Sequence, residues 1–472
     1  MVFSSLIFVF LFLTLNLAVY SLARSVKVRN VILLLFSLVF YAWGGVQYLF
    51  LLLGMSACSW FCAVQIQKRG EEKGKKLWMA IECAVLLGLL GIFKYLTFVL
   101  SNLQLWTGFP EVVPRIVLPI GISFYTFQLL SYVIDVYRGD VEAQPKYWKV
   151  LLYCSLFHQC IAGPIVRYQT VAEEIDERHV SVDDIAEGIR RFCVGLAKKA
   201  ILANSCASIA DTFLENTASA STAGLWLGMF CYMLQIYLDF SAYSDMAIGM
   251  GRMVGFHYLE NFNYPYAASS VQDFWRRWHI SLSTFFRDYI YIPLGGNRKG
   301  QLFTVRNMLA VWFLTGLWHG ASWNYILWGL YYFVFLVLER FVLKKILARL
   351  PVINHVYTLI VVFFGWVIFK FESLPQLGSV LVGLFAADGR KLWDLTASYG
   401  FQNNMFLLAF CVIAVTPLGK KLRDFVYAHV EEGSAGAAVM NVLDAVLPVI
   451  LLFLSMFALV GNSYNPFLYF QF

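Results

Sequence analysis

The sequence has 472 residues, of which 60% are apolar, 17% are aromatic and only 14% are charged. This composition excludes an ordinary soluble protein and predicts an all-α, polytopic membrane protein. The formal net charge of +7 is explained by cationic loops, and the sequence contains no nucleic-acid-binding motif.

Apolar runs recur along the whole chain. They lie at residues 1–23, 30–67, 95–114, 116–134, 150–166, 216–238, 307–338, 352–369, 404–419 and 445–472. About 20 apolar residues cross a bilayer as a helix. We therefore predict about ten to twelve membrane helices, some of them tilted or re-entrant, in a single domain over residues 1–472.

The N-terminal runs have features of their own. Residues 1–23 lack a charged start and are followed by a cluster of cations, which predicts an uncleaved first helix and a cytoplasmic loop. Residues 30–67 are long enough for a hairpin of two short spans that turns at Trp43-Gly44-Gly45. The cation-rich residues 68–76 predict another cytoplasmic loop.

Residues 167–199 form the least apolar stretch and predict a cytoplasmic loop with an amphipathic helix. Within it, Ser181-Val182-Asp183-Asp184 is typical of an N-cap, with the helix expected from about Ile185.

The nine cysteines are scattered, include no CxxC pair and are odd in number. This pattern indicates neither a disulfide framework nor a zinc site. Cys58 and Cys62 are one helical turn apart, but no histidine is near them in the sequence. We predict that both pack in the core.

His319 lies in the tripeptide Trp318-His319-Gly320, in the middle of the uncharged residues 307–338. A titratable side chain at that depth is costly and is seldom kept without a function. The run would measure about 48 Å as one helix, which is too long for an upright span. We therefore predict a strong tilt or a break near the histidine, marked by Gly316 and Gly320, with His319 facing a solvated chamber.

Residues 272–288 predict a helix that contains a second histidine, His279. At about 100° per residue, the His279 face carries the apolar side chains Trp275, Leu282 and Phe286. The opposite side carries the charged residues Asp273, Arg277 and Asp288. We expect this helix at the interface or at a cavity edge, with His279 directed inward. The alternative is a histidine that only packs against tryptophan.

Six cations and two anions lie between Asp273 and Arg306, a net charge of +4. This charge could dock an acidic acyl donor, such as coenzyme A phosphates or an acyl carrier protein, with Arg276 and Arg277 as the anchor. The alternative is anchoring of a cytoplasmic loop by the positive-inside rule.

The sequence contains no GxSxG elbow, no HExxH motif, no paired acids of the glycosidase kind and no dinucleotide fingerprint. The two inward histidines remain as candidates for chemistry. A neutral imidazole has a reference pKa near 6.5 and can accept a hydroxyl proton near neutral pH. This suits acyl transfer from a thioester to an alcohol, with a second polar group that stabilises the oxyanion.

Several motifs carry a family resemblance. They are DFWRRWHISL and RDYIYIPLGGN (residues 273–282 and 287–297), GLWHGASWN (316–324), YLDFSAYSDMAIG (237–249) and IAGPIVRY (161–168). As a linked set in this order they resemble the membrane-bound O-acyltransferase family. The start Met1-Val2-Phe3-Ser4-Ser5 is similar to the bacterial branch that acts in alginate O-acetylation.

The resemblance implies a bundle of tilted helices around a central passage, with a catalytic core at about residues 120–340. It also implies that His319 is the essential catalytic histidine and that His279 is its partner, in an orienting or donor role. The candidate substrate-binding residues are Trp318, Asn324, Trp275, Arg276, Arg277, Ser283, Asp239 and Asp245. One departure is His158, where the family pattern leads us to expect proline before the glutamine.

No bound cofactor or metal is expected, and acetyl-CoA or an acyl carrier protein is the expected donor. Bacterial members of the family work with an extracytoplasmic partner of the SGNH-hydrolase type, which acylates an envelope polysaccharide. The resemblance therefore implies an O-acetyltransferase in the bacterial cytoplasmic membrane.

Three alternatives stay open. Asp239 and Asp245 could hold a hydrogen-bond network in the chamber, or each could pair with Arg252 or another cation. The same histidines would serve D-alanyl transfer toward teichoic acids. A transporter or channel would also suit intramembrane titratable residues, although the sequence has no inverted repeat.

Overall fold

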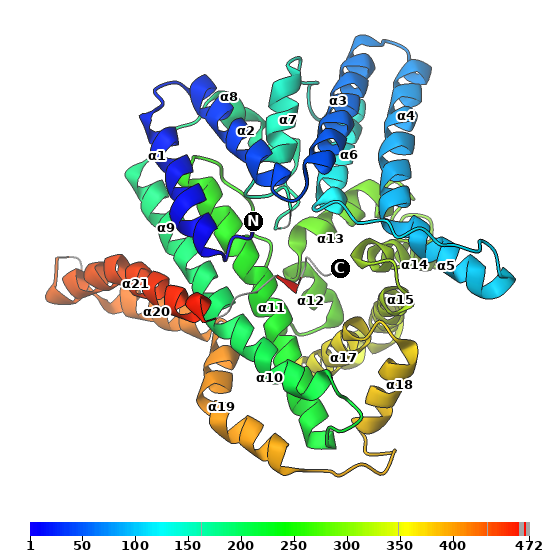
Figure 1. Ribbon diagram of the computed structural model, residues 1–472, viewed down its shortest axis with the longest axis vertical. Helices are drawn as coiled ribbons and strands as arrows, with labels where there is room; N and C mark the ends of the chain where they lie inside the picture. The colour runs from blue at the N-terminus through cyan, green and yellow to red at the C-terminus, as the bar shows by residue number, and fades with distance from the viewer. Residues whose placement is uncertain (162, 348, 432, 462–466, 469–472) are drawn as a thin grey trace. The chain divides into compact units, whose positions relative to one another are not determined.

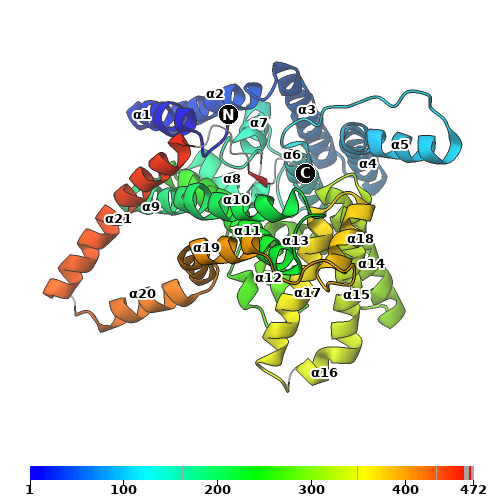
Figure 2. The same ribbon diagram turned by 60° about the horizontal axis from the view of Figure 1, so that its bottom comes forward.

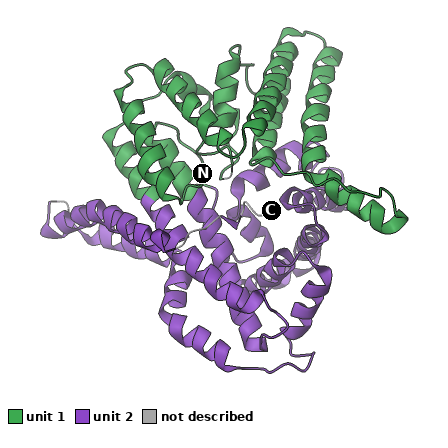
Figure 3. Cartoon of the chain, in the orientation of Figure 1, with its two compact units in different colours: residues 1–192, 244–260 green, residues 193–243, 261–472 purple. Residues whose placement is uncertain are grey.

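The fold is that of a computed structural model, which describes residues 1–161, 163–347, 349–431, 433–461 and 467–468. The described residues form helices and connecting segments and contain no strand, so the predicted all-α class is confirmed. The chain divides into two compact units (Figure 3). Unit 1 contains residues 1–192 and 244–260, and unit 2 contains residues 193–243 and 261–472.

Unit 1 holds the N-terminal helices (Figure 1). They are α1 (Thr14–Leu22), α2 (Val26–Ala42), α3 (Val46–Lys68), α4 (Glu72–Leu90), α5 (Leu96–Thr107), α6 (Ile122–Arg138), α7 (Tyr147–Ser155) and α8 (Tyr168–Asp176). The unit boundaries fall inside two further helices, α9 (Val182–Ala197) and α11 (Thr222–Met253).

Unit 2 holds the remaining helices. They are α10 (Asn204–Leu214), α12 (Val271–Arg277), α13 (Ile280–Phe286), α14 (Gln301–His319), α15 (Trp323–Leu338), α16 (Lys344–Leu347), α17 (Ile353–Lys370), α18 (Leu374–Gly383), α19 (Leu395–Ala414), α20 (Leu418–His429) and α21 (Ala435–Val460). Short π-helical segments are η1 (Ile7–Leu13), η2 (Gly91–Tyr95), η3 (Lys198–Ala203), η5 (Arg287–Tyr291) and η6 (Glu339–Leu343), and a 3-10 turn is η4 (Pro265–Ala267).

By length and composition, 7 helical stretches in the described part of the chain can cross a membrane. The count rises to 8 if α19 and α20, which meet at a 66° bend, form one span. The apolar stretch Ile7–Leu22 and α18 are shorter than this. The chain is therefore a multi-pass membrane protein, but the predicted number of ten to twelve membrane helices is not confirmed.

Two of the local predictions concern unit 1. The turn predicted at residues 43–45 is confirmed, because α2 and α3 flank it, but of these two helices only α3 is long and apolar enough to cross a membrane. The cap at Ser181 is also confirmed, because its hydroxyl oxygen accepts a hydrogen bond from the Asp184 amide at 3.0 Å. The helix begins at Val182, however, three residues before the predicted start.

The predicted end of the amphipathic helix near residue 199 is wrong. α9 continues through η3 into α10, and the stretch Val182–Leu214 is long and apolar enough to cross a membrane. Lys198 and Lys199 lie inside this continuous helical stretch and do not interrupt it. Lys199 is buried rather than solvated, for a reason given below.

The predicted break at the membrane histidine is confirmed at Gly320. α14 ends at His319 and α15 begins at Trp323, and the two helices run side by side (Figure 2). Gly316 does not break the helix, so that part of the prediction is wrong. It lies inside α14, where a Cβ atom would approach the Tyr325 carbonyl oxygen to 2.4 Å. The glycine therefore permits close packing of α14 on α15.

Candidate active site

Both candidate catalytic histidines lie in unit 2, in a dense group of aromatic side chains. His279 is 1% exposed and His319 is 6% exposed. The elements around them are α11, α12, α14, α15 and α17. Burial of two imidazoles among aromatic rings is costly unless their polar atoms are used, which favours a functional role.

We predicted that His279 lies inside one continuous helix. It lies instead at a break between two short helices. α12 ends at Arg277 and α13 begins at Ile280, with His279 at φ 44° and ψ 57°. The Ile280 amide donates to the Asn261 carbonyl oxygen at 2.9 Å instead of continuing the helix. The loop that contains Asn261 therefore changes the direction of the backbone at His279. The helical periodicity of residues 272–288 gives no information about that loop.

The inward direction predicted for His279 still holds. Trp275, Leu282 and Phe286 are buried with it, although two short helices bring them there and not one apolar face. Asp273 and Arg277 form a partly exposed ion pair at 3.0 Å on the other side of α12. The helical periodicity therefore predicted correctly which side chains are buried, but the single helix that it predicted is wrong.

Asn261 fixes the orientation of the His279 ring. Its Oδ1 atom accepts hydrogen bonds from the Ser281 amide at 3.2 Å and from the Ser281 hydroxyl at 2.9 Å. An amide N–H can only donate, so the Asn261 atom that faces it is the oxygen. His279 Nδ1 lies 3.2 Å from the same oxygen and therefore donates its proton to it.

This contact determines the chemistry of the opposite ring nitrogen. With the proton on Nδ1, Nε2 of a neutral ring carries a lone pair. Nε2 is buried and has no hydrogen-bond partner among the described residues. His279 lies outside the candidate membrane-spanning helices, and burial lowers its pKa to about 3. The ring is thus neutral at pH 7 and can accept a hydrogen bond.

Trp318 lies between the two histidines. Its ring centroid is 5.7 Å from that of His279 and 5.1 Å from that of His319, edge-to-face in both cases. The indole is 2% exposed. Trp318 therefore brings the two predicted catalytic residues into one site.

His319 ends α14 and is enclosed by aromatic rings from two other helices. Its ring centroid lies 4.8 Å from Trp328 on α15 and 5.3 Å from Phe369 on α17. The break at Gly320 places the histidine at a helix end, where the chain leaves the helical path. His319 is thus held in place by rings that pack against its edges and faces.

Three other predicted residues have structural contacts in this site. Asn324 is fully buried and donates to the Phe369 carbonyl oxygen at 3.0 Å, which ties α15 to α17. The Ser283 hydroxyl donates to the Trp275 carbonyl oxygen at 3.2 Å, which joins α13 to α12. Trp275 itself packs edge-on against Trp328 at 5.4 Å. These contacts support the walls of the site.

Arg276 and Arg277 lie on α12, which ends next to His279. Arg276 is exposed, and Arg277 is partly exposed in its ion pair with Asp273. A solvent-facing cation so close in sequence to a buried imidazole suits either a donor anchor or an anchor of the loop.

The two intramembrane aspartates are paired with cations, as one of the alternatives predicted. In unit 2, Asp239 lies 2.5 Å from the Lys199 ammonium and accepts the Leu468 amide at 2.7 Å. In unit 1, Asp245 lies 3.1 Å from the Arg191 guanidinium. The cation named as a candidate, Arg252, pairs with Asp184 instead.

Asp239 is also connected to the histidine site through its neighbour. Phe240, the next residue on α11, packs edge-to-face against His279 with a centroid distance of 4.8 Å. The ion pair therefore supports the backbone that carries one wall of the site.

His158, the departure from the family pattern, lies in unit 1 and is 1% exposed. Its Nδ1 atom is 2.9 Å from the Tyr258 hydroxyl oxygen. This contact explains how the histidine fills its buried position. The motif around it includes Ala162, which lies outside the described residues.

Asn261 and Ser281 were not among the predicted site residues. Asn261 lies 18 residues before His279. Only its place in a polar segment just ahead of an aromatic motif could have drawn attention to it.

Comparison with known proteins places these residues in a family. Residues 141–381 match the membrane-bound O-acyltransferase family. The probable alginate O-acetylase of Pseudomonas putida is 38% identical over 492 residues, and the match covers 100% of both chains. The peptidoglycan O-acetyltransferase of Helicobacter pylori is 34% identical over 438 residues, which covers 84% of this chain and 82% of the relative. The teichoic acid D-alanyltransferase of Bacillus subtilis is 28% identical over 233 residues, which covers 47% of this chain and 59% of the relative.

Proposed function

Because the chain belongs to the membrane-bound O-acyltransferase family, we propose that it moves an acetyl group from a cytoplasmic thioester toward a cell-envelope polysaccharide. The protein is an O-acyltransferase with several membrane helices. The observation that carries the proposal is the pair of buried histidines joined by Trp318. Acetyl is favoured because two full-length or nearly full-length relatives are named for O-acetyl transfer.

The chemistry that we propose at His319 is the first of two acyl transfers, from the thioester to an acceptor hydroxyl, before the outer partner passes the acyl group to the polymer. His319 takes the proton from the acceptor hydroxyl as the oxygen attacks the thioester carbonyl. A carbon–oxygen bond forms, the carbon–sulfur bond breaks, and the proton passes to the departing thiolate. His279 orients the acceptor, because its Nε2 lone pair can accept a hydrogen bond while Asn261 holds Nδ1.

The wider arrangement is part of the same proposal. Acetyl-CoA or an acyl carrier protein is the donor at the cytoplasmic face, with Arg276 and Arg277 as its anchor. A passage connects His319 to the outer side, where an SGNH-hydrolase-type partner acylates the polymer. The protein then belongs in the bacterial cytoplasmic membrane. The exposed position of Arg276 and the partial exposure of Arg277 on α12 support the donor anchor.

A labelling experiment separates the candidate functions. Protein in liposomes is given labelled acetyl-CoA, or labelled D-alanine on a carrier protein, together with an alcohol acceptor. Acetyl ester formation supports the proposal, and D-alanyl ester formation would favour transfer toward teichoic acids. Movement of the label into the liposomes without ester formation would favour a transporter and contradict the proposal.

Asn261 provides a further test of the site. We expect Asn261→Ala to lower the acyl-transfer rate constant by about 10²-fold, because a ring that is free to rotate misplaces Nε2. Asn261→Asp keeps an acceptor oxygen and should recover part of the loss. The measurement is the rate of transfer at saturating donor.

The matched control for this variant is Asn263→Ala, two residues along the same segment and exposed. It should leave the rate unchanged. If Asn261→Asp were as impaired as Asn261→Ala, an oriented ring would not explain the effect.

A further inference from the structure

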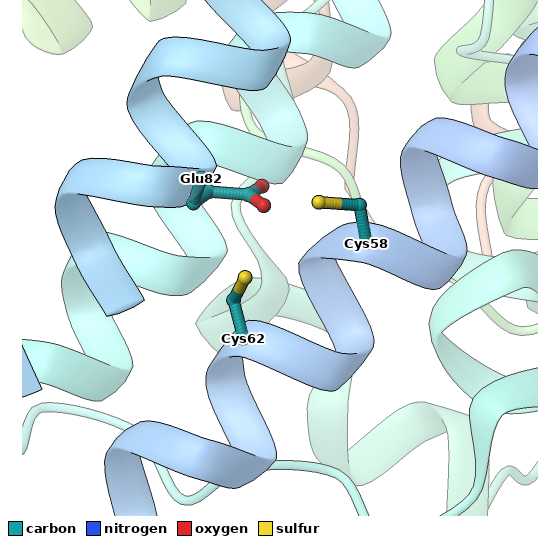
Figure 4. Close-up of side chains that lie close together, drawn as sticks. All are labelled: Cys58, Cys62 and Glu82. Atoms are coloured by element: carbon teal, nitrogen blue, oxygen red, sulfur yellow. The ribbon is translucent and has the colours of Figure 1, made fainter. Parts of the chain in front are cut away.

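A second cluster of reactive side chains lies in unit 1, away from the histidines in sequence. Cys58 and Cys62 lie one turn apart on α3, and Glu82 lies on α4. The two sulfur atoms and a carboxylate oxygen all lie within 4.8 Å of one another. Figure 4 shows the three side chains pointing toward one another across the two helices.

The carboxylate is the unusual member of the cluster. Glu82 is 0% exposed and lies in the candidate membrane span Glu72–Thr107. Its Oε1 atom accepts a hydrogen bond from the Ser59 hydroxyl, and the Cys58 and Cys62 thiols interact with the same carboxyl group. A carboxyl group at such a place needs a partner, which a proton, a hydrogen-bond donor or a metal ion can supply.

The ligand set and its spacing suit a zinc ion. Two thiolates and one carboxylate are ligands of the kind that zinc takes in proteins. With Zn–S near 2.3 Å and Zn–O near 2.1 Å, tetrahedral ligand atoms lie about 3.5–3.8 Å apart. Small side-chain rotations would bring the three atoms from their present spacing to this one.

We propose that Cys58, Cys62 and Glu82 form a zinc site that clamps α3 to α4. The Cys58 and Cys62 thiols release their protons to the solvent as they bind, the Glu82 carboxylate supplies the third ligand, and the site with its zinc ion carries a net charge of −1. Water or the Ser59 hydroxyl takes the fourth position. The site lies about 9 Å along α3 from the helix end at Lys68, so the ion can enter from the loop side. This role is independent of the acyl-transfer chemistry.

The test measures metal on the full chain. Purified, reduced protein in detergent is incubated with zinc sulfate, washed with a weak chelator and analysed for zinc. We expect about one zinc ion per chain, and a loss of roughly tenfold or more in Cys58→Ser, Cys62→Ser and Glu82→Gln. The matched control is Cys83→Ser, which changes the residue next to Glu82 but none of the cluster and should retain the ion.

A second measurement uses the unaltered protein, so it does not depend on the variants folding. Bound zinc should protect Cys58, which like Cys83 is partly exposed, from alkylation by N-ethylmaleimide, whereas Cys83 should react equally with zinc and after removal of the metal by a chelator, as read by peptide mass spectrometry. Protein that retains no zinc, or variants that retain as much as the parent, would overturn the proposal. So would protection that requires no metal and disappears with reductant, because it would indicate a disulfide.

Discussion

Replacing His319 with alanine is expected to lower acyl transfer by about 10² to 10⁴-fold, the usual contribution of a general base. The ring lies at the end of α14 beside Trp318, and the rest of that wall is aromatic. The tryptophan and phenylalanine rings that enclose His319 cannot take the hydroxyl proton in its place. The measurement is ester formation on the envelope polymer in cells and on a soluble alcohol in liposomes, with the protein level followed in parallel.

The same experiment needs a variant that keeps the space filled, because His319→Ala leaves a gap among packed rings. His319→Gln retains polarity and much of the volume but has no basic nitrogen, and it should be impaired to a similar extent. His429→Ala is the control, since His429 is exposed on α20 and its Nδ1 atom lies 2.8 Å from the Phe425 carbonyl oxygen of its own helix. Normal acylation in both His319 variants would end the proposed mechanism.

Replacing Lys199 with methionine is expected to destabilise the protein by about 3–5 kcal/mol, because it leaves Asp239 buried without its cation. The pair is nearly inaccessible, with side-chain exposures of 4% and 2%. The measurement is the thermal unfolding midpoint in detergent, and the variant should unfold at a lower temperature than the parent.

The double variant Lys199→Met/Asp239→Leu should recover much of that loss, because apolar side chains of similar size tolerate the same place. The exposed pair Lys76–Glu72, with exposures of 61% and 62%, is the matched control, and Lys76→Ala should change the midpoint little. If Lys199→Met were as stable as Lys76→Ala, the buried pair would not support α11.

Much of the site could be predicted because its signals are local. An imidazole in a long uncharged run indicates a buried functional group, and glycine beside it indicates a break. The burial of His319 and the helix end beside Gly320 are confirmed. The spacing of aromatic residues around His279 also predicted correctly that His279 is buried. Its side chain points inward both in the predicted continuous helix and in the observed pair of short helices.

The turn at His279 could not be predicted, because its cause lies outside the motif. Asn261 takes hydrogen bonds from the residues that start α13, and it does so from a loop 18 residues away. Helix propensity and periodicity describe neighbours along the chain. They contain no information about which distant polar group captures a backbone amide.

The amino-acid sequence by itself determined the all-helical membrane class, the hairpin that turns at residues 43–45, the break after His319 and the motifs of the family. These depend on hydropathy, glycine placement and residue order, which are properties of short segments. The tertiary structure alone decided which cation neutralises Asp239, which amide orients His279 and which carboxylate meets Cys58 and Cys62. Each of those pairs joins separate segments of the chain. Because a buried polar group without a hydrogen-bond partner costs free energy, the packing of the helices decides which partner each group has.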